Sequence, residues 1–210
     1  MIHISKMSGK LDGFQSISTN TTTNKYCKKQ NQKKDPDNIC THCYSWTMLK
    51  TFRQNITPAL QRNSDLLTSK ILHPDALPVI NQAFFRFNAH GELDLDKKKA
   101  TINLINYINI AIKNPHCNFA LWTKRFDIIK PYFDKNKKPK NFILVYSNPK
   151  INHIFKKPPT HFDKTFNNVY ENIEVKKQNC TGQRCMDCLL CYKLNTTNTI
   201  IEKVKNYGKK

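Results

Sequence analysis

The sequence is poor in acidic residues and in arginine. Its 210 residues include 35 basic and only 15 acidic side chains, which gives a formal net charge of +20. An excess of this size is typical of proteins with polyanionic partners, so we expect nucleic acid as a partner. Only five of the basic residues are arginine. The lysine excess therefore also fits an AT-rich coding bias, which would not reflect selection for bidentate phosphate contacts.

Two further absences bear on the compartment. No apolar stretch approaches the length of a membrane-spanning helix. The first residues, Met-Ile-His-Ile-Ser, lack the basic segment and the apolar core of a secretory signal. We therefore expect no membrane contact and a cytoplasmic, thiol-reducing setting. In such a setting, clustered cysteines bind metals more often than they form disulfides.

Seven of the eight cysteines fall into two sets, which are the strongest signal in the sequence. The C-terminal set has four thiols within twelve residues: Cys180, Cys185, Cys188 and Cys191. The N-terminal set has the spacing Cys-x12-Cys-x2-Cys and ends a polar loop over residues 28–38: Cys27, Cys40 and Cys43. A Cys-x2-Cys pair that ends a polar loop is typical of metal-binding or redox-active sites. The spacings suit zinc as well as an iron–sulfur cluster, so they predict the number of ligands better than the identity of the metal.

Hydrophobic patterns predict alternating strands and helices between the two sets. The expected strands are 14–19, 83–89, 119–123 and 142–146, with a weaker extended segment at 169–175 and an edge strand at 199–205. One helical region is expected over 44–72, and it restarts with Thr57 as N-cap and Pro58 in the first turn. A second helix is expected to be capped by Asp94 or Asp96 and to have Ile102, Ile105, Ile108 and Ile112 on its apolar face. A short helix is expected around 126–133.

Alternation of strands and helices predicts an α/β fold with parallel pairing and right-handed crossovers. A full eightfold barrel typically takes about 250 residues, so we expect an open, partial (β/α) barrel. The barrel would occupy residues 1–178. Residues 179–210 would form a C-terminal cysteine-rich metal-binding segment with an edge strand and a tail.

In parallel α/β folds, ligands bind where the strands end. The residues at these positions are the N-terminal thiols, His90-Gly91-Glu92, Lys124-Arg125 and Ser147-Asn148. Three thiolates can hold an iron–sulfur cluster and leave one iron without a protein ligand, whereas a structural zinc site normally fills all four positions. An open position on the metal would accept a substrate or cofactor.

Several of these residues also have simpler interpretations. Gly91-Glu92 on its own is a common turn before a helix. We expect His90 at the surface or rim, Lys124-Arg125 at a solvated strand end, and Cys117 as a small buried apolar residue. Trp122 and the phenylalanines near residue 85 are expected in the core and not as a platform for substrate.

Motifs along nearly the whole chain resemble the phage-encoded family called gene product eighty-eight. They are Cys43-Tyr44, Arg62-Asn63, Phe85 to Glu92, Ala120 to Lys124, and Asp187 to Tyr192. The pattern in turn resembles radical S-adenosylmethionine (SAM) enzymes, in which a three-cysteine loop binds a 4Fe-4S cluster and a Gly-Gly-Glu-like turn meets the amino group of SAM.

The resemblance implies a role for each set of residues. Cys27, Cys40 and Cys43 would bind the 4Fe-4S cluster, and the C-terminal four cysteines would hold an auxiliary cluster. The residues implied in binding SAM are Tyr44, Asn88, His90, Gly91 and Glu92. The resemblance also implies an electron donor and, for a phage protein, the host cytoplasm.

The sequence departs from the radical SAM pattern in three places. The first cysteine gap is twelve residues instead of three, His42 stands where an aromatic residue is usual, and His90 replaces the first glycine of the turn. The longer loop adds only about 1 to 2 kcal/mol of closure entropy, which is small beside metal–ligand energies.

Two functions stay open at this point. The first is a radical SAM-like iron–sulfur enzyme that modifies a nucleic acid or nucleotide. The second is a non-enzymatic zinc protein, in which Cys40 and Cys43 join Cys185 and Cys188 in one tetrahedral site while the lysines bind nucleic acid. The sequence favours the first, because the zinc site leaves Cys27, Cys180 and Cys191 without roles. It predicts neither the substrate nor the oligomeric state.

Overall fold

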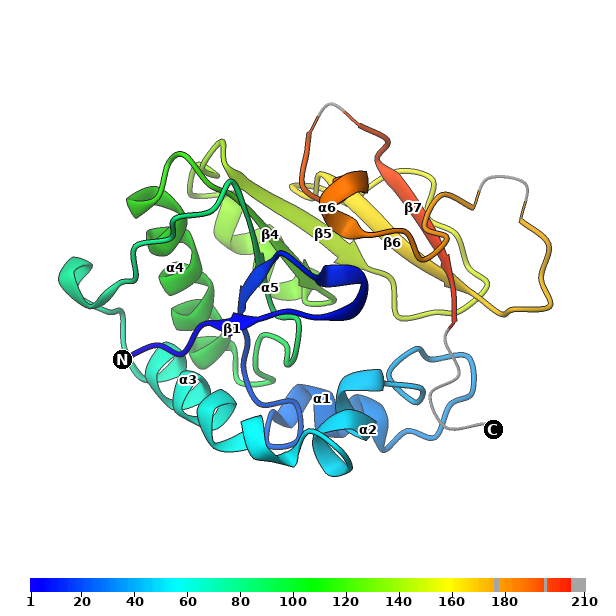
Figure 1. Cartoon of the computed structure of the whole chain (residues 1–210), viewed down its shortest axis with the longest axis horizontal. Coiled ribbons are helices and arrows are strands. Elements are labelled where there is room, and N and C mark those ends of the chain that lie inside the picture. Colours follow the sequence, from blue (N-terminus) through cyan, green and yellow to red (C-terminus); the bar gives the residue numbers. More distant parts are fainter. Residues whose placement is uncertain (176–177, 195, 205–210) are drawn as a thin grey trace.

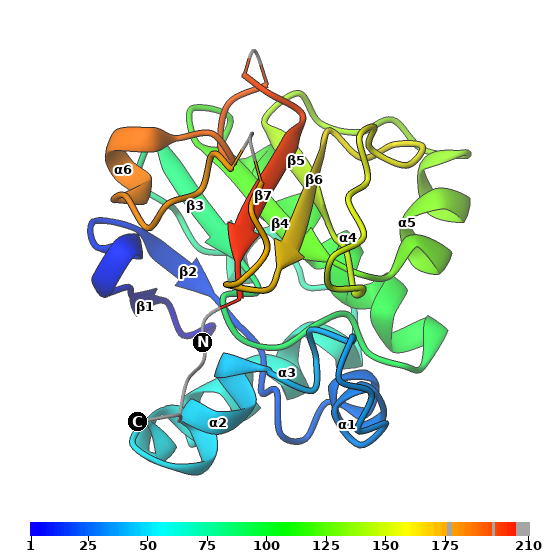
Figure 2. The same ribbon diagram turned by 90° about the vertical axis from the view of Figure 1, so that its right-hand side faces the viewer.

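The computed structural model describes residues 1–175, 178–194 and 196–204. Seven strands form one sheet, in which they lie in the order in which they occur along the chain (Figures 1 and 2). The first two strands pair antiparallel, and every later pair is parallel. The strands are β1 (Ser5–Lys6), β2 (Gln15–Ile17), β3 (Phe84–Phe87), β4 (Asn118–Thr123), β5 (Phe142–Ser147), β6 (Lys164–Val169) and β7 (Thr199–Lys203).

Helices cover both faces of the sheet and one of its ends. They are α1 (Lys25–Asn31), α2 (Tyr44–Lys50), α3 (Thr57–Ser69), α4 (Lys97–Lys113), α5 (Phe126–Phe133) and α6 (Cys185–Cys188), with short 3₁₀ turns at Gly9–Leu11, Gln54–Ile56 and Pro74–Ala76. In Figure 2, α4 and α5 lie on one side of the sheet and α6 lies on the other, while α1 and α2 lie beyond the carboxyl ends of the strands. None of the helices in the described ranges is long and apolar enough to cross a membrane.

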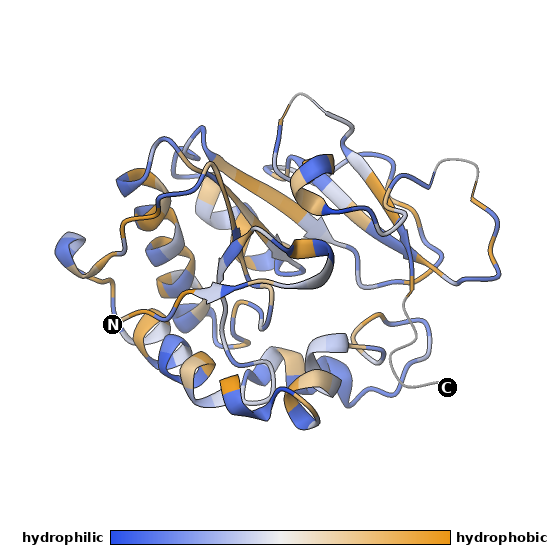
Figure 3. Ribbon diagram, in the orientation of Figure 1, coloured by the Kyte–Doolittle hydropathy of each residue, from blue (hydrophilic) through white to orange (hydrophobic). Residues whose placement is uncertain are grey.

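The alternation of side chains along β3 divides the interior into two cores. Phe85 and Phe87 face the large core beneath α3, α4 and α5, where the Phe87 ring stacks 4.2 Å from that of Tyr107. On the opposite face, Trp122 packs in a smaller core with Tyr192 from the segment after α6. Figure 3 shows the matching pattern, with hydrophobic central strands and helices that are hydrophilic on the outside.

The predicted α/β class and the parallel pairing are confirmed. The barrel is not shown, because β1 and β7 are the two edges of the sheet and no pairing between them occurs in the described residues. The predicted edge strand near residue 199 is β7. Cys117 is fully buried in the large core, as expected for a small apolar residue.

Two local predictions are wrong, and one strand was missed. The polar run 28–38 is not all loop, since α1 extends to Asn31 after Asn24 caps its first turn by accepting a 2.9 Å hydrogen bond from the backbone of Cys27. The last parallel strand before the cysteine-rich segment is β6, which ends where the predicted segment 169–175 begins. The strand β1 was not predicted. Its two residues are too few to show an alternation of apolar and polar side chains.

Two details of the helices also differ from the predictions. The cap of α3 is Ile56, and Thr57 is already helical. In α4, which Asp96 caps as expected, Ile112 is 60% exposed and the buried face includes Asn106 instead. Asn106 is buried because its side chain bonds the backbone of Leu72 and of the end of α3, at Leu67 and Lys70. A polar residue with such partners can stand on a buried face that hydrophobicity alone would not assign to it.

Gly91 is required by close packing between the ends of β2 and β3. It has φ +83°, and a Cβ atom at this position would lie 2.0 Å from Oγ1 and 2.7 Å from the carbonyl oxygen of Thr19. The backbone oxygen cannot swing away as a flexible side chain could. Gly9 also has a positive φ, of +64°, but a Cβ there would meet no atom within 4 Å.

We therefore expect Gly91→Ala to lower the free energy of unfolding by about 3 kcal/mol or more, since backbone strain and overpacking add. Gly9→Ala should lower it by only about 1 to 2 kcal/mol, because it adds strain alone. Urea denaturation of the two variants measures the difference. Equal losses would show that the contact with Thr19 does not constrain the fold.

Candidate functional site

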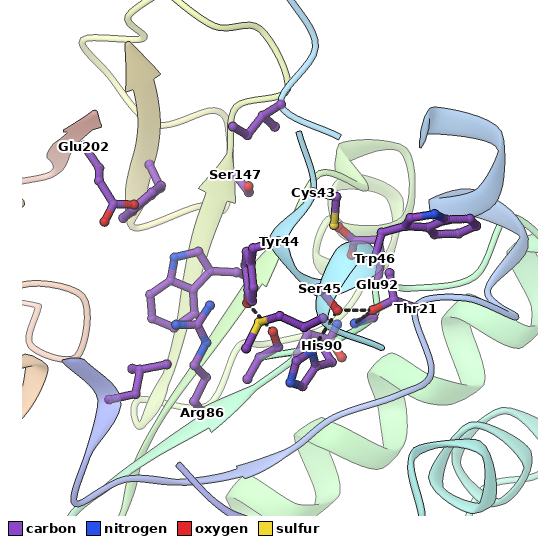
Figure 4. Close-up of a pocket in the computed structure, with 18 of the residues that line it drawn as sticks. Thr21, Cys43, Tyr44, Ser45, Trp46, Arg86, His90, Glu92, Ser147 and Glu202 are labelled. Atoms are coloured by element: carbon purple, nitrogen blue, oxygen red, sulfur yellow. Dashed lines mark hydrogen bonds between the residues drawn. The ribbon is translucent and has the colours of Figure 1, made fainter. Parts of the chain in front are cut away.

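A cavity of about 620 Å³ lies at the carboxyl ends of the strands. Its walls come from the segments that follow β2, β3, β4 and β5, from α1 and α2, and from the C-terminal cysteine-rich segment. In Figure 4, Tyr44, Arg86, Ser147 and Glu202, from four different elements, lie around the same space. This is the edge of the sheet at which the sequence predicts ligand binding.

Most of the predicted site residues line this one cavity. They are Cys27, Cys40, Cys43, Tyr44, Asn88, His90, Gly91, Glu92, Cys180, Cys185 and Cys191. Cys188 lies outside the lining, where its Sγ accepts a contact from Nε2 of Gln183 at 3.4 Å. All eight cysteines are free thiols.

Local hydrogen bonds hold the N-terminal thiols in place. Cys27 lies in the first turn of α1, and Cys43 is the residue from which α2 begins. The backbone of Cys40 donates to the side chain of Asn38 at 2.9 Å. The loop is anchored at Ile39, whose backbone donates to the carbonyl of Pro149 beyond β5 at 2.8 Å. The twelve-residue gap is therefore a helix and an anchored turn.

The three thiols, Glu92 and Lys124 share one electrostatic environment. Burial raises the pKa of the Cys27 thiol well above its usual range, and Glu92, Cys43 and Cys40 raise it further, while Lys124 opposes them. Burial also raises the pKa of Cys40. Burial lowers the pKa of Lys124, but the surrounding Cys40, Glu92, Cys43 and Cys27 outweigh this and raise it. An ammonium ion therefore lies among thiols that become thiolates on binding a metal.

We expected a solvated strand end at Lys124-Arg125, but both side chains bond to other residues of the protein. Nζ of Lys124 donates to Oγ of Ser147 at 2.9 Å, across the ends of β4 and β5. Arg125 is only 2% exposed and forms a bidentate pair with Asp127, with both N–O distances 2.8 Å. Nη1 of Arg125 also donates to the backbone carbonyls of Leu93 and Asp94. The prediction failed because Ser147 and the segment after β3, which are distant in sequence, supply partners to these cations.

Glu92 connects the end of β3 to the end of β4. Its Oε1 accepts hydrogen bonds from the backbone of Leu93 at 2.9 Å and from Oγ1 of Thr123 at 2.6 Å, and its Oε2 accepts from the backbone of Lys124 at 2.9 Å. Its backbone carbonyl accepts from the side chain of Asn24 at 2.7 Å. The carboxylate is thus a structural link, and a ligand can use only its remaining lone pairs.

His90 lies on the wall of the cavity, at the rim where it was expected, but it is buried, with 5% exposure, and not at the surface. Its Nδ1 lies 2.7 Å from Oγ of Ser45, which lies 2.5 Å from Oγ1 of Thr21. Thr21 also accepts the backbone N–H of Gly91, and the hydroxyl groups of Thr21 and Ser45 can each donate or accept along this chain. The chain, drawn in Figure 4, fixes the orientation of the His90 ring through Nδ1.

The imidazole of His90 is neutral near pH 7. Burial lowers its pKa to about 4, and the charges of Arg53 and Arg86 contribute. A neutral ring has one donor and one acceptor nitrogen and carries no charge.

Tyr44 and Asn88 complete this wall. The Tyr44 hydroxyl donates to the backbone carbonyl of Ala89, and its ring lies 6.1 Å from that of His90. Asn88 has φ +55°, and its Oδ1 accepts from the Tyr107 hydroxyl at 2.8 Å. Tyr44 thus fixes the turn before His90, while Asn88 joins the cavity wall to α4.

The C-terminal thiols form a second neighbourhood. Burial raises the pKa of Cys191, and the nearby Cys180, Cys185 and Cys188 add to the effect, while Arg86 opposes it. Sγ of Cys180 lies 3.7 Å from the carboxylate of Glu202 on β7.

Neither set of thiols is arranged so that it could coordinate a single metal ion. In the described residues, which include every cysteine, no three His, Cys, Asp or Glu side chains are grouped so that they could hold a metal ion. The thiols of each set are close enough to shift one another's pKa, yet they do not converge on one point. The predicted metal binding therefore has no support from the side-chain geometry as it stands.

Sequence reasoning missed Arg86, Ser45 and Thr21. Arg86 is the most informative, because the alternation of β3 turns it to the face opposite Phe85 and Phe87. A single cation between aromatic residues in a strand was an available signal. Ser45 and Thr21 gave no signal, since isolated hydroxyl residues are common.

The fold and the cavity define the chain as an α/β protein with a thiol-lined pocket at the carboxyl ends of its parallel strands. It belongs to the family described as Gene product 88, whose family model matches residues 9–189. The match includes β2 to β6 and six of the seven clustered cysteines. No curated protein and no solved structure matches the chain. The predicted family is confirmed, whereas the radical SAM resemblance is not supported by these comparisons.

The depressed pKa of His90 predicts a specific dependence of stability on pH. The unfolded state binds a proton on this residue below a pKa of about 6.5, and the folded state does so only below about 4. The free energy of unfolding should therefore fall as the pH falls from 6.5 to 4, by up to about 3 kcal/mol from this residue.

In His90→Gln this part of the pH dependence should disappear, whatever the overall loss of stability. The matched control is His73→Gln, because the side chain of His73 is 76% exposed. Urea denaturation from pH 4 to 8 measures the slope for each variant. If His90→Gln kept the slope of the unmodified protein, the buried neutral imidazole would be contradicted.

Proposed function

We propose that the chain is an iron–sulfur enzyme of radical SAM type. The observation that carries the proposal is the meeting of Cys27, Cys40 and Cys43 with Lys124 and the turn ending in Glu92 on one wall of one cavity. The consecutive order of the strands is also that of a partial (β/α) barrel.

The donor set of this wall suits an iron–sulfur cluster better than a single ion. Thiolates are the usual ligands of such clusters, and each of three cysteines binds a different iron. Ligands of a cluster therefore stand farther apart than ligands of one ion, which agrees with thiols that interact but do not converge. When bound, the cluster would supply one-electron chemistry.

The residues of this chain have separable tasks in the proposal. Lys124 stabilises the negative charge of the bound thiolates. Tyr44 and Glu92 hold the turn after β3 at the cavity. His90 offers an uncharged imidazole. The volume of about 620 Å³ lies in the range of small-molecule sites, so SAM and part of a substrate would fit.

The C-terminal thiols would hold a second, auxiliary group. Cys180, Cys185, Cys188 and Cys191 come from the segment that covers the sheet on the face opposite α4 and α5. Metal–ligand bonds there would stabilise a segment in which the one helix among the described residues, α6, has four residues.

The competing zinc hypothesis joins Cys40 and Cys43 with Cys185 and Cys188. The structure favours two separate sets, because the pKa of Cys40 responds to Cys43, and that of Cys185 responds to Cys188. Cys188 also lies outside the shared cavity. Nucleic acid as substrate or partner remains a prediction from the lysine excess.

The test is purification without oxygen, followed by measurement of iron, sulfide and zinc and by absorption spectra with and without SAM. We expect iron and sulfide, and a spectrum that SAM changes. Cys43→Ala should remove the SAM effect and the iron of the N-terminal set, while the iron of the C-terminal set stays.

The matched control is Cys117→Ala, because Cys117 is buried in the core away from both sets. This variant should keep the full iron content and lose only some stability. A protein that contains zinc alone, or a Cys43→Ala variant with unchanged iron and SAM response, would contradict the proposed function.

A further inference from the structure

The cavity has more cationic than anionic side chains. Its lining includes four cations, Lys10, Arg53, Arg86 and Lys124, and two carboxylates, Glu92 and Glu202. Lys10 pairs with Glu202, and the carboxylate of Glu92 is occupied by three donors at the ends of β3 and β4. The cations that remain attract an anion into the cavity.

Arg86 has no carboxylate partner in the described part of the chain. It forms none of the ion pairs found there, and its Nε is buried without a hydrogen-bond partner. The ionisable groups that influence its pKa most are Tyr44, Tyr192, Cys185 and Cys191, none of which is a carboxylate. Holding a guanidinium ion in such surroundings is unfavourable unless an anion compensates it.

The orientation of Arg86 suits recognition of a planar or tetrahedral anion. Its guanidinium carbon lies 4.1 Å from the centre of the Trp122 ring, over the ring. Figure 4 shows the side chain of Arg86 extending from β3 into the space between Tyr44 and Glu202. A guanidinium group held over an aromatic ring keeps its edge nitrogens free to bind two oxygens of a carboxylate or phosphate.

We infer that Arg86 anchors an anionic group, a carboxylate or a phosphate, of the substrate that enters the cavity. The inference rests on the proposed function only in taking the cavity as a small-molecule site, and it deepens that function by giving the class of substrate. Arg86 contacts the wall built with Trp122 and Tyr192, whereas Lys124 lies among Cys27, Cys40 and Cys43. The anionic group thus binds at a different wall from the one proposed for the cofactor.

The experiment uses simple probes and the fluorescence of Trp122, measured in the full chain with Trp46→Phe, so that Trp122 is the single tryptophan. The probes are inorganic phosphate, benzoate, and benzamide as the neutral counterpart of benzoate. We expect benzoate or phosphate to bind at least tenfold more tightly than benzamide, with a difference that shrinks as salt rises. The anion that binds more tightly identifies the group.

Variants assign the effect to Arg86. Arg86→Gln should raise the Kd of the preferred anion at least tenfold and leave the Kd of benzamide unchanged. Arg86→Lys should give an intermediate Kd for the anion, because lysine keeps the charge without the planar edge of the guanidinium group. Arg62→Gln, at an exposed position on α3, is the matched control and should change nothing. If Arg86→Gln does not fold, Arg86→Lys, which keeps the charge in the cavity, decides: a Kd for the preferred anion equal to that of the parent chain would contradict recognition by the guanidinium edge.

Three outcomes would overturn the inference. The first is that neither anion binds more tightly than benzamide. The second is that Arg86→Gln binds anions as tightly as the parent chain does. The third is that Arg86→Gln changes only the metal content of the C-terminal thiols. The last result would assign Arg86 to those thiols. A protein with zinc alone that binds anions through Arg86 would sink the iron–sulfur proposal and leave this inference standing.

Discussion

The arrangement of the cavity depends on the hydrogen bonds of Glu92. Its carboxylate is bonded by three donors at the ends of β3 and β4, and its backbone carbonyl is bonded by Asn24. The same Asn24 side chain caps α1 and fixes the first turn, where Cys27 lies. One buried residue therefore sets the positions of the two strand ends, of Lys124 and of the first thiol. Charge-assisted hydrogen bonds in a buried place are strong enough for this task, and removing one partner leaves the others unpaired.

The sequence predicted the parts of this arrangement that depend on local pattern. The parallel strands β3, β4 and β5 follow from short apolar runs, and the gathering of the cysteines at one edge follows from strand order and spacing. It failed where single polar contacts decide. α1 extends into a run of polar residues after Asn24 caps its first turn, and His90 is buried because Oγ of Ser18, just after β2, bonds its backbone N–H while the hydroxyl of Ser45 bonds its ring. No property of a polar tripeptide indicates which of its members a neighbouring loop will cover.

His90 stands where the radical SAM pattern has the first glycine of its turn, and the structure shows how this chain accommodates a side chain there. The residue that must stay without a side chain is Gly91, where Thr19 leaves no room for a Cβ. At the preceding position the side chain turns to Ser45, away from that contact. The turn thus separates a steric requirement from a chemical one, and a larger residue at the first position adds an uncharged imidazole without disturbing the packing.

The two walls of the cavity differ in the groups that compensate the charge of their cations. This difference would orient a molecule bound between the walls. Lys124 lies among thiols that carry negative charge when they bind a metal, so its charge is matched by the group proposed for that wall. Arg86 lies over an aromatic ring, with Cys185 and Cys191 near it, and forms no ion pair with a carboxylate in the described residues, so its charge can also attract an anion that enters from outside. A molecule with one anionic end would therefore be oriented with that end at Arg86 and the remainder toward the N-terminal thiols. Such orientation is what brings a reacting atom to a fixed place beside a cofactor.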